Sequence, residues 1–98
     1  MRYDLVVSRS LEELARRYVW WQPANVTLAR RSHFLCQVMQ LGTEDDVRVL
    51  RSMLGDDAFR DALAHAEPGI LDARSWNFWH LVLFRHPPPP LPERVLPP

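Results

Sequence analysis

The distribution of proline is the feature that most constrains the fold of this chain. Seven of the nine prolines lie between His86 and Pro98, and only Pro23 and Pro68 precede them. A proline run lacks backbone N–H donors and favours extended polyproline II structure, so this end of the chain is unsuited to helix. We therefore predict a helical domain over residues 1–86 and an extended, proline-rich tail over residues 87–98.

Apolar side chains recur at helical spacing before the tail, where they predict short amphipathic helices. The predicted helical stretches are residues 10–21, 25–41, 43–55, 56–66 and 72–84. Residues 3–7 form the one segment whose pattern allows a strand. The last helix is apolar nearly all round, which is typical of a helix in the centre of the core or one covered on a second side. The predicted fold class is all-α, a small bundle of four to five short helices with an extended tail.

Residues that favour helix ends support this division. Ser10, Thr43, Asp56 and Asp72 stand where an N-cap side chain can accept a hydrogen bond from the first turn. Gly42 follows the second helix at the position of a left-handed C-cap. These signals predict where the chain turns between helices.

Composition excludes several classes of protein. The 98 residues carry twelve arginines, no lysine and twelve acids, so the net charge is zero, which argues against binding nucleic acid through bulk charge. Cys36 is the single cysteine, which excludes an internal disulfide and a zinc site built on cysteine pairs. Polar residues interrupt every apolar run, so we expect no signal peptide, no membrane span and a cytoplasmic location. The use of arginine in place of lysine suggests a GC-rich bacterial genome.

The sequence contains no convergent set of catalytic groups. The four histidines lack the spacing of a helical metal site. The acid pairs Asp45–Asp46 and Asp56–Asp57 stand at helix starts, where the helix dipole stabilises acids for local reasons. We therefore predict a protein that is not an enzyme and that needs no metal or cofactor.

Charge is divided unevenly along the chain. Residues 43–67 carry three arginines and seven acids, which opposes DNA binding by the two helices that superficially resemble a helix-turn-helix there. Residues 1–42 carry six arginines and three acids. The predicted contacts to phosphate or to an acidic partner are Arg16, Arg17, Arg30 and Arg31. A small DNA-binding regulator that uses these arginines is the alternative function.

The aromatic side chains point to a protein partner. Two adjacent tryptophans cannot both face inward from one short element, so part of this area is expected on the surface. Buried aromatic anchors often dominate the energy of protein interfaces, although the same side chains also build tryptophan-rich cores. The predicted partner-binding residues are Trp20, Trp21, Trp76, Phe78 and Trp79. An extended proline tail loses little entropy on docking and suits wrapping around a partner.

Several segments together resemble a family of small bacterial proteins encoded beside AbiE-type nucleotidyltransferase genes. The most specific segments are Leu41-Gly42-Thr43-x-Asp45-Asp46 and Arg74-Ser75-Trp76-x-Phe78-Trp79-His80, and the likeness extends from about Leu14 to Leu83. The resemblance implies an antitoxin-like protein that binds and neutralises a nucleotidyltransferase-type toxin. Aromatic anchors would fill pockets on the toxin, and the acidic surface of residues 43–67 would mimic or displace phosphates. The family offers no binding residues to carry over by position, and the winged helix of some AbiE antitoxins is not evident.

Overall fold

A computed structural model of the chain describes residues 11–85 and 88–92. These residues form helices and no strand, which confirms the all-α prediction. The helices are residues 11–18, α2 (Ala24–Ala29), α3 (Arg31–Leu41), α4 (Glu44–Leu54), α5 (Asp56–Ala64) and α6 (Ala73–Phe84). The predicted strand over residues 3–7, the cap at Ser10 and the domain boundary at residues 86–87 lie outside the described residues.

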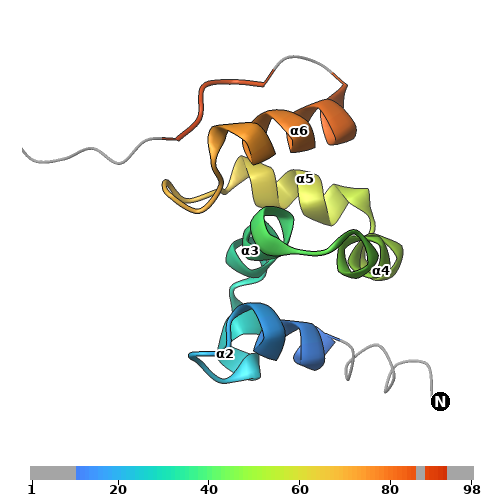
Figure 1. The fold of residues 1–98 in the computed structure, drawn as a ribbon, viewed down its shortest axis with the longest axis vertical. Helices are drawn as coiled ribbons and strands as arrows, with labels where there is room; N and C mark the ends of the chain where they lie inside the picture. The colour runs from blue at the N-terminus through green and yellow to red at the C-terminus, as the bar shows by residue number, and fades with distance from the viewer. Residues whose placement is uncertain (1–10, 86–87, 93–98) are drawn as a thin grey trace, which may run out of the picture.

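The helix α3 lies at the centre of the molecule. It packs against α2, α4, α5 and α6, while α6 and α2 lie at opposite ends (Figure 1). Both α4 and α6 pack against α3 and α5, whereas no Cα atom of α4 lies within 8 Å of one in α6. The two helices are therefore separated from each other although both pack against α3 and α5.

The core is centred on α3, not on α6. Phe34, Leu35 and Val38 of α3 are fully buried and belong to the same hydrophobic cluster as Leu50 of α4 and Phe59 of α5. Each such side chain contributes roughly 1.5–3 kcal/mol of burial free energy. Of the two positions that the apolar character of α6 allowed, the second is found: α6 lies at one end of the molecule, and residues 88–92 pack against it from another side.

The predicted helix over residues 25–41 is divided in two. α2 ends at Ala29, and the Arg30 N–H donates to the Thr27 carbonyl 3.1 Å away before α3 begins. The turn allows α2 to bury Ala24 and Thr27. No proline or glycine marks this break, so local sequence signals did not predict it.

The helix caps agree in part with the prediction. Thr43 and Asp72 are N-caps, whose side chains accept hydrogen bonds from the backbone N–H groups of Asp46 and Ser75. The N-cap of α5 is a glycine, whereas Asp56 is the first helical residue and accepts two hydrogen bonds from an arginine of α4.

The glycines between helices have different roles from each other. Gly42 is extended, with φ −72° and ψ 152°, so the predicted left-handed cap is wrong. A Cβ at Gly42 would lie 2.4 Å from the Val38 carbonyl oxygen, and glycine is therefore needed for space. Gly55 has φ 84°, a backbone conformation that glycine adopts without strain, and it joins α4 directly to α5.

The described part of the tail, residues 88–92, has neither helix nor strand and packs against α6. The Trp76 indole N–H donates to the Pro89 carbonyl at 2.8 Å, and Leu91 packs against the edge of the core. The tail therefore contributes to the burial of Trp76 within the chain itself.

Candidate functional site

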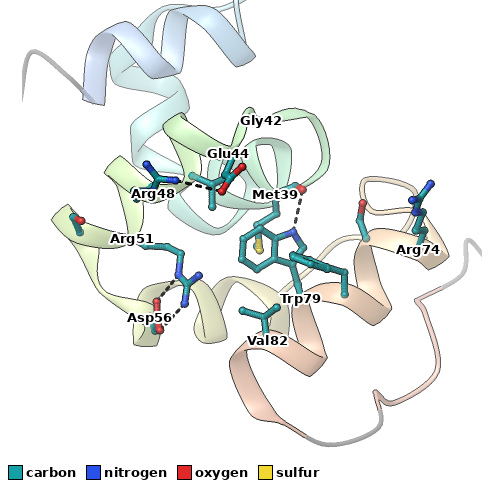
Figure 2. Close-up of a pocket in the computed structure, with 13 residues that line it drawn as sticks. Met39, Gly42, Glu44, Arg48, Arg51, Asp56, Arg74, Trp79 and Val82 are labelled. Atoms are coloured by element: carbon teal, nitrogen blue, oxygen red, sulfur yellow. Dashed lines mark hydrogen bonds and ion pairs between the residues drawn. The ribbon is translucent and has the colours of Figure 1, made fainter.

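A groove of about 810 Å³ lies between α4 and α6 (Figure 2). One face of each helix lines it, at the three- and four-residue spacing of helical neighbours. The contributing residues are Glu44, Val47, Arg48, Arg51 and Ser52 of α4, and Arg74, Ser75, Phe78, Trp79 and Val82 of α6. Met39, Gly42 and Asp56 complete the lining. The groove is the space between α4 and α6, which both pack against α3 and α5.

The apolar part of the groove is held rigidly. Met39 and Trp79 are each only 5% exposed, and the Trp79 indole N–H donates to the Met39 carbonyl at 3.0 Å. The Trp79 ring also lies 5.9 Å from the Phe59 ring and 5.3 Å, edge to face, from the Phe78 ring. Phe78 itself is 55% exposed, so the groove offers an open aromatic side chain beside a fixed one.

Charged side chains surround this apolar strip. Arg48 pairs with Glu44 at 3.3 Å, and Arg51 forms two hydrogen bonds with Asp56 at 2.7 and 2.9 Å. The bonds from Arg51 hold the pKa of the Asp56 carboxyl below its ordinary value, so this carboxylate stays ionised. Among the described residues Arg74 is the groove arginine without a direct ion pair, although its charge is felt by the nearby Asp72 carboxylate, whose pKa it helps to lower.

The structure separates the predicted aromatic residues into three groups. Trp76 and Trp79 are each 5% exposed and belong to the core, and Trp79 also lines the floor of the groove. Phe78 lines the groove. Trp20 and Trp21 are 77% and 55% exposed, and their rings meet edge to face with centroids 5.8 Å apart. They belong to the turn before α2, and α2 lies at the end of the molecule away from α6 (Figure 1). The predicted aromatics therefore do not form one surface.

Three of the four predicted contact arginines are already paired within the chain. Arg16 lies 3.5 Å from Glu12, Arg17 lies 2.7 Å from Asp46, and Arg30 pairs with Glu67. Arg31 is exposed and forms no ion pair within the described residues. The four arginines therefore do not present a free cationic surface.

The acidic segment over residues 43–67 is largely compensated as well. Each of its seven acids has a basic partner: Glu44 and Asp45 with Arg48, Asp46 with Arg17, Asp56 with Arg51, Asp57 with Arg60, Asp61 with His65 and Glu67 with Arg30. Such pairing reduces the negative electrostatic potential of this surface, which mimicry of phosphate groups would require.

A second, smaller pocket of about 450 Å³ brings together His33 and His65 beside the Arg30–Glu67 pair. Burial, and then the nearby Arg30, lower the pKa of His33, so its imidazole is neutral near pH 7. In the part of the chain that the structure describes, no three histidine, cysteine or acidic side chains are placed to hold a metal ion. The pocket therefore lacks the groups of a metal site.

Comparison with known proteins yields no match to a protein-family model, a curated protein or a solved structure. No helix among the described residues has the length and apolar character needed to cross a membrane. The groove itself was not predicted from the sequence. Val47 and Arg51 of α4 are four residues apart, as are Phe78 and Val82 of α6, so each pair lies on one face of its helix. That spacing indicates a groove only once α4 and α6 are known to lie on its two sides.

Proposed function

We propose that this chain acts by binding another protein and has no catalytic role. The observation that carries the proposal is the exposure of three large aromatic side chains, Trp20, Trp21 and Phe78, each more than half accessible. Aromatic residues are enriched in the centres of protein interfaces, where their burial supplies much of the binding energy. The two other aromatic residues predicted to bind a partner are needed for the core, which makes these three the available anchors.

The resemblance to proteins encoded beside AbiE-type nucleotidyltransferases supports a specific partner. We propose that the chain is an antitoxin-like protein that neutralises such a toxin. Because the acids of residues 43–67 are paired with arginines and a histidine, steric covering of the toxin is better supported than phosphate mimicry. The exposed aromatic side chains would hold the complex together.

The experiment is co-expression of the chain with the nucleotidyltransferase encoded by the adjacent gene. We expect a complex that co-purifies and a culture whose growth is restored. The double variant Trp20→Ala and Trp21→Ala should weaken both effects, whereas the control Val49→Ala, at an exposed apolar side chain outside the groove, should not. Absence of a complex between the unaltered proteins would contradict the proposal.

The alternative of a DNA-binding regulator gains no support from the geometry, because Arg16, Arg17 and Arg30 are engaged in ion pairs. It stays a prediction with a direct test. Binding to its own promoter should be detectable in a gel-shift titration at low salt and should weaken steeply as salt rises. A flat titration would exclude it.

A further inference from the structure

We propose that the groove between α4 and α6 binds an amphipathic helix of a partner protein, and that this helix presents a carboxylate to Arg74. The inference rests on the proposed function, since it names the segment of the partner that the chain would recognise. It adds a second binding surface, distinct from the Trp20–Trp21 turn.

The shape of the groove favours a helix. Its walls run from Glu44 to Ser52 on α4 and from Arg74 to Val82 on α6, or roughly 12 Å along each helix axis. Both walls are helix faces that already rest on α3 and α5. A third helix laid between them would pack side chains into the spaces between theirs, as amphipathic helices do in hydrophobic grooves.

The side chains of the groove specify an apolar strip on that helix. Val47 and Val82 are half-buried on opposite walls, and Phe78 stands between solvent and the buried Trp79. An incoming leucine or phenylalanine would cover these surfaces without displacing the Trp79–Met39 hydrogen bond. Two or three apolar side chains at successive turns fit the two turns of wall on each side.

The charges specify an acid on the partner. Three arginines and two acids line the groove, and the acids are occupied by Arg48 and Arg51. Arg74 is exposed at the first turn of α6 and, among the described residues, is the groove arginine without a direct ion pair; the Asp72 carboxylate of the N-cap interacts with its charge only at longer range. A carboxylate there would gain a guanidinium partner, whereas a basic residue would be repelled.

The test uses a display library of helical peptides of about 14 residues, in which one face is apolar and the polar positions are randomised. We expect the peptides selected on this chain to carry Asp or Glu at one end of the helix. Phe78→Ala and Arg74→Glu should each weaken their binding on the order of tenfold. Leu81→Ala is the matched control for Phe78, because Leu81 is also 55% exposed on α6 but does not line the groove.

Arg85→Glu is the matched control for Arg74, because it makes the same charge change at an exposed site after α6 that does not line the groove. Replacing the peptide's acid with lysine should restore binding to the Arg74→Glu variant and weaken binding to the unaltered chain. Both results together would show that the carboxylate meets Arg74.

Other occupants of the groove give other outcomes, and each would overturn the inference. Failure to select peptides, together with Phe78-dependent binding of anilinonaphthalene sulfonate, would indicate a small organic anion. A dimer that Phe78→Ala dissociates would indicate a second copy of the chain. If the toxin complex forms and is insensitive to Phe78→Ala and Arg74→Glu, this inference fails while the proposed function stands.

Discussion

Tyr18 joins the helix over residues 11–18 to the start of α4, and its removal gives the sharpest test of how this fold is held together. The Tyr18 O–H donates to the Asp46 carboxylate at 2.5 Å and accepts the Thr43 N–H at 3.2 Å. The Tyr18 side chain is buried, and the Asp46 side chain is only 14% exposed. Tyr18→Phe keeps the ring and removes only these two hydrogen bonds.

The expected cost follows from the type of each bond. A hydrogen bond to an ionised carboxylate contributes about 1.5–3 kcal/mol, and a neutral one about 1 kcal/mol. Because water can reach part of this site, we expect Tyr18→Phe to lower the free energy of unfolding by about 2–3 kcal/mol. That is a large share of the roughly 5–15 kcal/mol that stabilises an ordinary domain.

Urea denaturation followed by circular dichroism would measure this change as a lower midpoint with an unchanged slope. Arg17→Ala is the control, because it removes an exposed partner of the same carboxylate and should cost much less. In an Asp46→Asn background most of the effect of Tyr18→Phe should disappear, since the charged acceptor is gone. A loss below about 0.5 kcal/mol in the unaltered background would refute the reasoning.

The effect should also depend on pH. The hydrogen bond from Tyr18, and then the contact with Arg17, hold the pKa of Asp46 below its ordinary value. A carboxyl group of this kind stabilises the fold above its ordinary pKa of about 4 and loses that contribution as pH falls through the lowered value. The difference between the unaltered chain and Tyr18→Phe should therefore shrink in acid below about pH 4.

Three further predictions test other parts of the fold. Gly42→Ala should lower the free energy of unfolding by about 1–3 kcal/mol in thermal or urea denaturation, because the new Cβ meets a backbone carbonyl of α3. Burial raises the pKa of the Cys36 thiol to about 12, so alkylation by iodoacetamide at pH 8 should stay slow until denaturant is added. Since the unfolded thiol loses its proton first, stability should also fall between pH 9 and 12, by at most about 1.4 kcal/mol per pH unit for this group. Deleting residues 86–98 should shift the tryptophan fluorescence to the red, in a background that lacks Trp20 and Trp21, because Trp76 loses the cover and the hydrogen-bond acceptor that the tail provides.

The sequence predicts best where several local signals favour the same helix boundary. α4 begins after Thr43 and ends at Gly55 as expected, because a cap, three acids in the first turn and a positive-φ glycine all favour the same boundaries. The break at Arg30 was not predicted because neither proline nor glycine marks it, whereas the structure buries Ala24 and Thr27 of the short helix before the turn. Long-range packing, and not propensity, decides that boundary.

For α6, the sequence contained the spacing that separates buried from exposed aromatic residues, but the prediction relied on the large number of aromatic residues instead. Trp76, Trp79, His80 and Leu83 are spaced as one helical face, and all four are buried. Phe78 falls off this face and is exposed. Treating the aromatic residues of α6 as one group obscured this periodicity, which separates core side chains from an available one. The groove was beyond local reasoning, because its two walls come from helices distant in the sequence.

The two exposed aromatic regions allow a final argument about binding. A tryptophan can bury roughly 150–250 Å² in an interface, worth about 4–6 kcal/mol at 25 cal/mol per Å² before the cost of association. Trp20 and Trp21 together could therefore support a complex on their own, as could the groove around Phe78. If one partner spans both regions, the losses of binding energy caused by Trp20→Ala and Phe78→Ala should add, because distant sites act independently. If each region binds a different protein, titration of one partner should be sensitive to only one of the two substitutions.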